Sequence, residues 1–195
     1  MWKISKRFDF CYAHRVHNQS LDETLSLGSG CKCRHWHGHQ GAYTISVSGE
    51  YLENGMVIDF KNLSFVKDII DTYLDHKTIV DQNDPVLSLM LSEDILTDDL
   101  MTNSVFYDGT NLNISVIDKL SSPSADDFSP KSTVLNEYLD SFVFVDYVPT
   151  SENLAQWMYG VIMRILYKYF PERKFDVEVE FSETPKTSAI YNGPV

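Results

Sequence analysis

Residues 37–51 read HGHQGAYTISVSGEY, and their side chains alternate in character. Tyr43 and Ile45 share one parity with two histidines, whereas small polar residues hold most of the positions between them. Residues 2–14, WKISKRFDFCYAH, alternate in the same way and end in His14 on the apolar parity. A period of two residues is typical of a strand with one buried face. The sequence therefore predicts two consecutive strands that carry histidines at neighbouring ends.

Two helices and one further strand are predicted from the rest of the chain. Apolar residues recur at helical spacing over 60–74. A second helix is expected after Pro149, with Thr150 or Ser151 as its N-cap. Residues 175–183 alternate again and predict the last strand. The order β-β-α, an acidic middle and then α-β favours an α+β fold, in which helices cover one face of an antiparallel sheet.

The middle of the chain is strongly acidic. Residues 81–140 hold 12 of the 28 acidic residues and only two lysines, which gives this stretch a net charge of −10. We interpret it as an insertion within a single domain that spans residues 1–195. The first forty residues differ, because six basic residues there outnumber three acidic ones. A small anionic substrate near the N-terminal motifs is therefore compatible with the low pI.

Composition also excludes several classes of protein. The net charge of −12 argues against a nucleic-acid partner, since phosphate backbones call for an excess of Lys and Arg. No apolar run is long enough for a membrane span. The N-terminus lacks the apolar centre of a secretory signal, so a cytoplasmic protein with no membrane partner is expected.

The histidines of the two predicted strands suit a metal ion. Side chains two residues apart on a strand point to the same side, so His37 and His39 can bind one ion, with His14 as a third ligand. Three imidazoles leave a fourth coordination position open for water or substrate, as in catalytic zinc sites. The alternative is a closed, structural site in which Cys31 and Cys33 join His37 and His39.

The cysteines favour chemistry over cross-linking. Cys11, Cys31 and Cys33 are odd in number and lie near histidines, which suits metal or nucleophile chemistry in a reducing compartment. Lys32 and Arg34 flank Cys33, and nearby cations lower the pKa of a thiol. Cys33 is therefore a candidate base or nucleophile. The alternative is a loop cysteine without a chemical role.

Two further positions carry carboxylates that need an explanation. Asp75 and His76 close the first predicted helix, where such a pair can shuttle a proton, although a solvated helix end explains it as well. Glu183 closes the last strand on its apolar parity, where a carboxylate requires a partner. Either an Arg or the amidine-like edge of a ligand would serve.

Six short motifs then occur in a fixed order. They are FCYAHR (10–15), CRHWHGH (33–39), GMVIDF (55–60), LDH (74–76), PTSENLA (149–155) and ET (183–184). Together they resemble the 6-pyruvoyltetrahydropterin synthase / 6-carboxytetrahydropterin synthase (QueD) family. The resemblance covers roughly residues 1–80 and 141–195. Residues 77–80 and the long connection that follows them depart from the family pattern, which bears on substrate specificity.

The resemblance implies a fold, an assembly and a substrate. The fold would be the tunnelling fold (T-fold), an antiparallel four-stranded sheet with two helices packed on one face. Its subunits would form a homo-oligomer, with trimers that pair into hexamers and active sites at the subunit interfaces. The substrate would be 7,8-dihydroneopterin triphosphate, and zinc (Zn2+) would be bound by His14, His37 and His39.

The resemblance also implies roles for the remaining motif residues. Cys33 would be the general base that takes a proton from the substrate side chain. Asp75 and His76 of a neighbouring subunit would complete a proton relay with it. Glu183 would anchor the aminopyrimidine edge of the pterin, which answers the need of its carboxylate for a partner.

The family contains two reactions. The pyruvoyl branch eliminates triphosphate and rearranges the side chain, whereas the carboxy branch, in routes to queuosine and other 7-deazapurines, also releases acetaldehyde. The carboxy branch resembles Cys-x3-His-Gly-His, which Cys33 matches, and the pyruvoyl branch Cys-x5-His-Gly-His, which Cys31 matches. We expect Cys33 as the base and the carboxy product. The alternatives are the pyruvoyl product and a non-catalytic protein that binds a pterin or purine.

Overall fold

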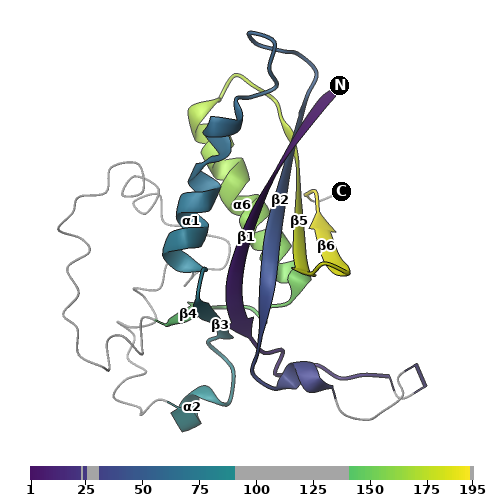
Figure 1. The fold of residues 1–195 in the computed structure, drawn as a ribbon, viewed down its shortest axis with the longest axis vertical. Helices are drawn as coiled ribbons and strands as arrows, with labels where there is room; N and C mark the ends of the chain where they lie inside the picture. Colours follow the sequence, from purple (N-terminus) through teal and green to yellow (C-terminus); the bar gives the residue numbers. More distant parts are fainter. Residues whose placement is uncertain (23, 26–30, 91–140, 194–195) are drawn as a thin grey trace, which may run out of the picture.

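The computed structural model describes residues 1–22, 24–25, 31–90 and 141–193. Six strands form one sheet in the order β4-β3-β1-β2-β5-β6 (Figure 1). The strands are β1 (Trp2–His14), β2 (His37–Gly49), β3 (Lys77–Asp81), β4 (Phe142–Val145), β5 (Asp176–Thr184) and β6 (Thr187–Tyr191). The helices are α1 (Phe65–Tyr73), α2 (Leu87–Met90) and α6 (Ser151–Tyr169), with 3-10 turns η1 (Lys32–Arg34) and η2 (Phe60–Leu63). Within these ranges no helix is both long and apolar enough to cross a bilayer.

The two strands predicted at the start of the chain form and pair with each other. β1 and β2 are antiparallel along their whole length, from Trp2 opposite Gly49 to His14 opposite His37. β2 then pairs antiparallel with β5, the strand predicted at 175–183. This long central ladder confirms the antiparallel part of the predicted sheet.

The predicted four-stranded antiparallel sheet is wrong for the chain as a whole, because the sheet has six strands and is mixed. β3 runs parallel to β1, with Tyr12 opposite Lys77, and β4 runs parallel to β3. β6 adds an antiparallel edge strand next to β5. All three additional strands have only four or five residues. Strands this short carry little periodic signal, and a parallel partner is separated in sequence by a crossover connection.

Both predicted helices form. The first is shorter than predicted, since residues 60–63 make η2 and α1 begins only at Phe65. α6 begins at Ser151, and the side chain of Thr150 accepts a hydrogen bond from the amide of Asn153 at 3.3 Å. Thr150 is therefore the N-cap that the sequence offered as one of two choices.

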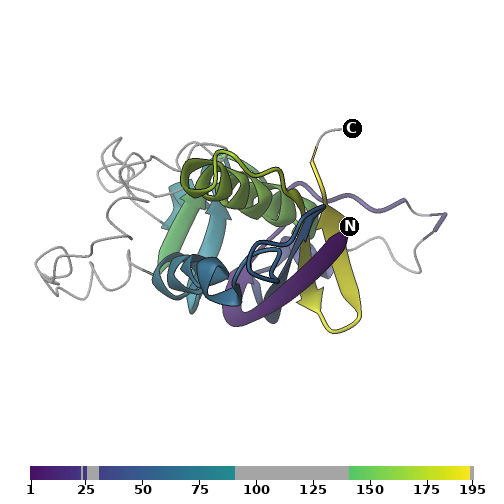
Figure 2. The ribbon, with the colours of Figure 1, turned by 90° about the horizontal axis from the view of Figure 1, so that it is seen from above.

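The core lies between the sheet and the helices α1 and α6 (Figure 2). Alternate residues of β1, including Phe8, Phe10 and Tyr12, face this core and are almost fully buried. Tyr43 and Phe181, which have no exposed surface, continue the aromatic layer on β2 and β5 with ring centroids 4.8 Å apart. The aromatic layer leads directly along β1 to His14, which is also buried. The residues of β1 that fill the core and the candidate metal ligand His14 therefore lie on the same face of the strand.

Most of the acidic insertion predicted at 81–140 lies outside the described residues, which resume at 141. Its first ten residues are described. Asp81 ends β3, a turn follows, and α2 closes with Met90. Leu87 of α2 packs with Val80 and Phe144 in a second, smaller apolar cluster. The start of this segment is thus part of the packed fold, and the single-domain arrangement over 1–195 stays a prediction.

Gly41 gives a test of how tightly the core supports the end of β2. A Cβ at this position would lie 2.8 Å from a ring carbon of buried Tyr12 and 3.4 Å from Phe181. We expect Gly41→Ala to lower the free energy of unfolding by about 1–3 kcal/mol, because neither ring can move away. Gly160→Ala is the matched control, since nothing lies within 4 Å of its Cβ and alanine favours a helix by up to about 1 kcal/mol.

Urea denaturation at one fixed protein concentration measures both changes. A Gly41→Ala variant that unfolds at the wild-type midpoint would contradict the tight packing.

Candidate metal centre

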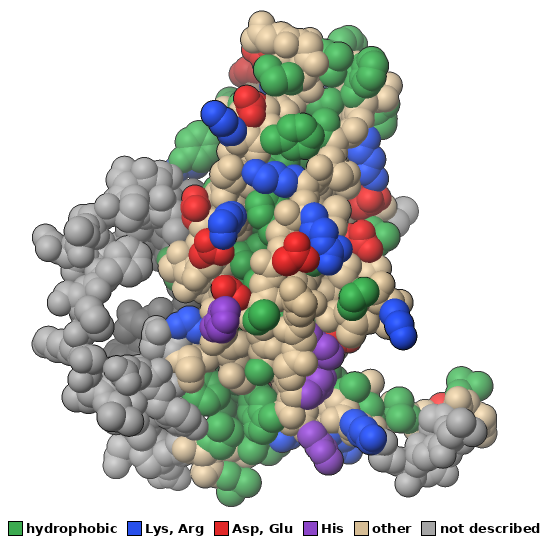
Figure 3. Space-filling model, viewed as in Figure 1, with side chains coloured by type: hydrophobic (Ala, Val, Ile, Leu, Met, Phe, Trp, Pro, Cys, Tyr) green, Lys and Arg blue, Asp and Glu red, His purple; other side chains and the backbone are tan. Residues whose placement is uncertain are grey.

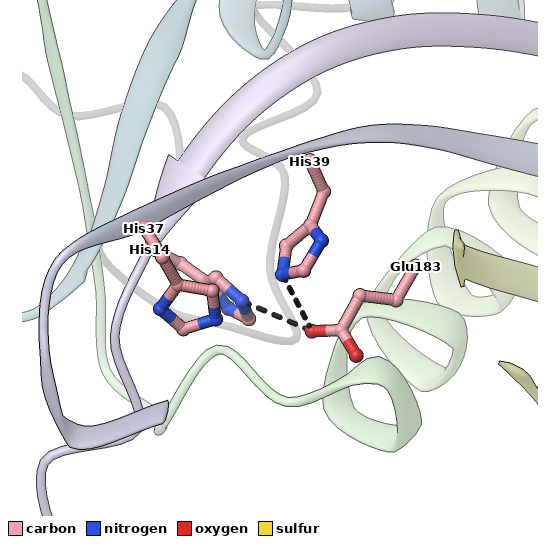
Figure 4. Close-up of side chains that lie close together, drawn as sticks. All are labelled: His14, His37, His39 and Glu183. Atoms are coloured by element: carbon pink, nitrogen blue, oxygen red, sulfur yellow. Dashed lines mark ion pairs between the residues drawn. The ribbon is translucent and has the colours of Figure 1, made fainter. Parts of the chain in front are cut away.

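Three histidines and one glutamate converge at one end of the sheet (Figure 4). His14 ends β1, His37 and His39 begin β2, and Glu183 lies near the end of β5. One potential ligand atom from each of the four residues lies within 4.8 Å of those of the others. The pairing of His14 with His37 brings the imidazoles together, with ring centroids 4.6 Å apart. The structure therefore brings together the three predicted metal ligands and adds Glu183 to them.

Backbone carbonyls orient two of the imidazoles. Nδ1 of His14 donates to the carbonyl oxygen of Pro149 at 2.7 Å, and Nδ1 of His37 donates to that of His35 at 2.7 Å. A carbonyl oxygen can only accept, so the proton of each neutral ring resides on Nδ1 and the lone pair on Nε2. This arrangement is the usual support of histidines that bind a metal through Nε2. The role of Pro149 was not predicted, because its carbonyl acts through the backbone and leaves no side-chain pattern.

Two Nε2 atoms of the cluster lack hydrogen-bond partners and are therefore available to bind a cation. Nε2 of His14 and Nε2 of His39 are buried and make no hydrogen bond of normal geometry. They lie 3.0 and 3.3 Å from Oε1 of Glu183, as the dashed lines in Figure 4 show. Three neutral imidazoles and a carboxylate form a donor set that zinc accepts in four-coordinate sites. The three histidines would hold the ion, and Glu183 lies near enough to be a fourth ligand.

The protonation states agree with this interpretation. Burial lowers the pKa of His39 below its ordinary value, so its imidazole is neutral near pH 7. The contact with His14 lowers the pKa of Glu183, helped by the other two histidines and opposed by its partial burial. Glu183 is therefore ionised. A neutral imidazole and an ionised carboxylate are the forms that bind a metal.

Tyr12 closes the site from the core side. Its ring lies 5.1 Å from that of His14 and 5.7 Å from that of His39. Burial, with a contribution from the charge of Glu183, raises the pKa of Tyr12 far above its ordinary value. Tyr12 is thus a neutral, largely apolar floor. His14 is buried, while His37, His39 and Glu183 are partly exposed, so the cluster is open on one side.

The two cysteines beside the histidines lie outside the metal cluster. No cysteine belongs to a metal-type cluster within the described ranges, so the closed Cys/His site gains no support. The thiol of Cys31 instead donates to Oε1 of Gln19 at 2.8 Å. The carbonyl of Cys33 accepts from the amide of Val16 at 2.8 Å, which holds Cys33 next to the residues that follow His14.

The pKa of Cys33 differs from the expectation. Burial raises it, and a hydrogen bond with Cys31 and the charge of Glu183 act in the same direction. The prediction that flanking cations lower this pKa is wrong, because Lys32 and Arg34 are exposed to solvent while the thiol is partly desolvated. Cys33 is two residues before His35, whose carbonyl oxygen accepts from Nδ1 of His37, so the chain holds it close to the metal cluster.

Asp75 and His76 contact each other and the backbone of Cys11. Oδ2 of Asp75 is 3.0 Å from Nδ1 of His76, and Oδ1 of Asp75 accepts from the amide of Cys11 at 2.8 Å. Partial burial would raise the pKa of Asp75, but the Cys11 amide and His76 together hold it below its ordinary value. His76 adopts a left-handed backbone with φ of 59°, and 79% of its side chain is exposed. One chain alone thus leaves the predicted relay separate from Cys33.

Two buried ion pairs next to the site were not predicted. Nε of Arg15 lies 2.8 Å from Oδ2 of Asp84, and Nε2 of His17 lies 3.0 Å from Oδ2 of Asp81. Both carboxylates are almost fully buried. They belong to the segment interpreted as an acidic insertion, and no periodic pattern there indicated that these two carboxylates would be buried and paired. The ion pairs instead attach the loop after His14 to the end of β3.

Comparisons with known proteins show the family of this chain. A profile of the 6-pyruvoyl tetrahydropterin synthase family matches residues 3–194. The chain is 35% identical over 96 residues to 6-carboxy-5,6,7,8-tetrahydropterin synthase of Aquifex aeolicus, a match that covers 44% of this chain and 56% of that protein. It is 36% identical over 88 residues to a putative enzyme of the same name from Pyrococcus abyssi, covering 38% and 54%. The chain thus spans about half the length of these curated relatives.

Solved structures extend the similarity to the whole chain. An uncharacterized protein from Wolinella succinogenes is 33% identical, with a TM-score of 0.77 and coverage of 99% of this chain and 98% of that one. The 6-pyruvoyl tetrahydropterin synthase of Plasmodium falciparum, at 18% identity, has a TM-score of 0.56 over 100% and 98% of the two chains, and shares the fold. The family profile spans nearly all 195 residues. The chain therefore belongs to the 6-pyruvoyl tetrahydropterin synthase family.

Proposed function

We propose that the protein is a zinc-dependent lyase that acts on 7,8-dihydroneopterin triphosphate and forms 6-carboxy-5,6,7,8-tetrahydropterin, as in routes to queuosine and other 7-deazapurines. The observation that carries this proposal is the convergence of unpartnered Nε2 atoms from His14 and His39 beside His37. Two relatives that bear the name 6-carboxy-5,6,7,8-tetrahydropterin synthase support the choice of product.

The metal cluster would receive the side chain of the substrate. When zinc is bound, it supplies Lewis-acid chemistry that acidifies hydroxyl groups. His14, His37 and His39 hold this position, with two rings locked by the carbonyls of Pro149 and His35. The neutral ring of Tyr12 underneath keeps water from one side.

Cys33 would act as the general base. Its thiol lies close enough to Glu183 for that charge to raise its pKa. A thiolate with a raised pKa is the stronger base, although less of it is present at neutral pH. A cationic metal in the cluster would offset the charge of Glu183, and so favour the thiolate.

Asp75 and His76 would complete the relay from a neighbouring subunit. In this chain the side-chain contacts of the two residues run to the backbone of Cys11 and to each other, while the side chain of His76 is largely exposed. A second chain could therefore meet His76 without displacing core residues. This role requires a homo-oligomer, for which we propose a trimer or hexamer.

Glu183 would orient the pterin ring through its aminopyrimidine edge. The carboxylate is ionised and about a quarter of its side chain is exposed, so it can accept two parallel N–H bonds. The same carboxylate is also near enough to the histidines to serve as a fourth metal ligand. The two roles make opposite predictions for zinc content.

The second candidate reaction is the pyruvoyl one. Cys31 matches the spacing of that branch. Its thiol contacts that of Cys33, so the two candidate bases lie side by side. A non-catalytic protein that binds a pterin or purine is the remaining alternative. Tight binding of a pterin triphosphate without any turnover would favour it.

Zinc content tests the metal centre. We expect about one zinc per chain after purification with zinc, because three imidazoles and an open position form a catalytic-type site. His37→Ala should lose most of the metal, while His76→Ala should retain it, as measured by inductively coupled plasma mass spectrometry. Equal zinc in both variants would rule out the three-histidine centre.

The cysteine pair tests the chemistry and the product. We expect Cys33→Ala to keep its zinc and to lose at least about 100-fold in kcat, the usual contribution of a general base. Cys31→Ala is the matched control and should stay active. Mass spectrometry of the products from 7,8-dihydroneopterin triphosphate should detect acetaldehyde and the carboxy product. A pyruvoyl product, or loss of activity only in Cys31→Ala, would contradict the assignment.

Glu183→Gln separates the anchor from the ligand role. Since an amide keeps the shape but loses the charge, we expect the KM for the pterin substrate to rise about tenfold or more with zinc content unchanged. Steady-state kinetics and metal analysis on the same sample measure the two quantities. Loss of zinc in this variant would instead assign Glu183 to the metal.

A further inference from the structure

Two cysteines lie two residues apart in one tight turn beside the metal cluster. Cys31 is the N-cap of η1, and Cys33 lies within it. The amide of Arg34 donates to the carbonyl of Cys31 at 3.3 Å and closes the turn. The rise and pitch of a 3-10 turn place Cα atoms two residues apart about 5–6 Å from each other. A disulfide spans Cα atoms about 4.4–6.8 Å apart, so the backbone already has the spacing that such a bond needs.

The two thiols also face each other. The thiol of Cys33 is hydrogen-bonded with that of Cys31, and the thiol of Cys31 donates to Oε1 of Gln19 at 2.8 Å. The carbonyl of Cys33 accepts from the amide of Val16 at 2.8 Å, which fixes the backbone of the turn. The sulfur atoms are therefore held side by side, and a bond between them requires only a rotation of side chains.

A small oxidant can reach this pair. Both side chains are partly exposed, and Cys31 lines a cavity of about 460 Å³ in the connection between β1 and β2. Figure 3 shows histidine side chains (purple) at the surface of the lower end of the molecule, where this connection leaves the sheet. The third cysteine, Cys11, is exposed on β1 and gives a comparison within the same chain.

A bond between the two cysteines would suit regulation better than stability. It would enclose only Lys32, and a loop this short gains little from the lost entropy of the unfolded chain. Exposed or strained disulfides are the ones that are readily reduced and that serve as regulatory bonds. Within the described ranges no cysteine belongs to a metal-type cluster, so the thiols can be oxidised without removing a metal ligand.

We propose that Cys31 and Cys33 are a redox modification site, at which hydrogen peroxide converts the two thiols into a reversible disulfide. One sulfur attacks the O–O bond, which forms a sulfenic acid and releases a first water. The other sulfur displaces the hydroxyl of the sulfenic acid, which forms the S–S bond and releases a second water. The thiols lose two electrons and two protons in total, and the peroxide takes up both. An external dithiol reverses the bond by exchange.

The effect on catalysis rests on the proposed function. In that function a cysteine is the general base, and a sulfur in a disulfide can no longer take up a proton. The same loss follows whether the base is Cys33 or Cys31, because the bond consumes both thiols. His14, His37 and His39 are untouched by the reaction, so the oxidised protein keeps its zinc.

Thiol counting on the zinc-loaded protein tests the modification. The protein is treated with hydrogen peroxide, unfolded, labelled with N-ethylmaleimide and weighed as an intact chain. The reduced wild type should take up three labels, one for each cysteine, and the oxidised wild type only one, because two thiols are lost. Peptide mapping should find the bond between Cys31 and Cys33. Dithiothreitol should restore all three labels.

Single serine variants locate the bond. Cys31→Ser and Cys33→Ser should each abolish the cross-linked peptide, whereas Cys11→Ser is the matched control and should keep it. We expect oxidation to lower the kcat of the wild type at least about 100-fold, the usual contribution of a general base, with zinc content unchanged. Dithiothreitol should restore the activity of the wild type but less of that of Cys31→Ser, since an unpaired sulfenic acid proceeds to sulfinic acid.

The outcomes separate the two proposals. If the reduced wild type forms a pterin product and peroxide yields no bond between Cys31 and Cys33, the modification site is wrong and the proposed function stands. If the bond forms but the reduced protein forms no product, the modification site stands and the proposed function fails. A bonded protein that keeps full activity would overturn the effect on catalysis and exclude both cysteines as the base. Loss of zinc together with the bond would assign the inactivation to the metal and contradict the proposal.

Discussion

The pairing of β1 with β2 is the constraint on which the rest of the structure depends. The two strands share one register from Trp2 opposite Gly49 to His14 opposite His37. Because side chains alternate, a slip of one residue would turn every inward residue of β1 to the other face. The same parity buries Phe10 and Tyr12 and directs His14 into the metal cluster. Packing of the core and assembly of the site therefore depend on the same strand register, and a change of register would disrupt both.

The start of α6 depends on the same pairing. Burial of His14 would be unfavourable if both ring nitrogens lacked partners. The carbonyl of Pro149 satisfies Nδ1, and the next residue, Thr150, is the N-cap of α6. The N-terminus of α6, the longest helix among the described residues, is thus tied to the end of β1 by one hydrogen bond. A metal at Nε2 would satisfy the second nitrogen of this buried ring, which explains why a polar residue can continue an apolar strand face.

The sequence predicts the elements whose periodicity is long. Thirteen-residue alternation specifies β1 and β2, and the stripe after Pro149 specifies α6. The alternation of side chains also predicted that His14, His37 and His39 would lie on one face of the sheet. It could not predict β3, β4 or β6, because five residues or fewer define no period. The parallel partners of β3 and β4 also depend on crossover connections. The raised pKa of Cys33 was equally inaccessible, because it depends mainly on burial by residues that are distant in sequence, whereas the sequence shows only the flanking cations.

The buried carboxylates show how an acidic chain accommodates charge beside the metal cluster. Asp84 is almost fully buried, and a buried carboxylate without a partner is strongly destabilising. Arg15 is therefore needed for the stability of the fold, because it pairs with Asp84. His17 has the same role for Asp81. These pairs join the loop that carries Cys31 and Cys33 to the turn between β3 and α2. Charge near the site is consequently set by paired, desolvated groups, and the net charge of −12 says little about what this end of the sheet attracts.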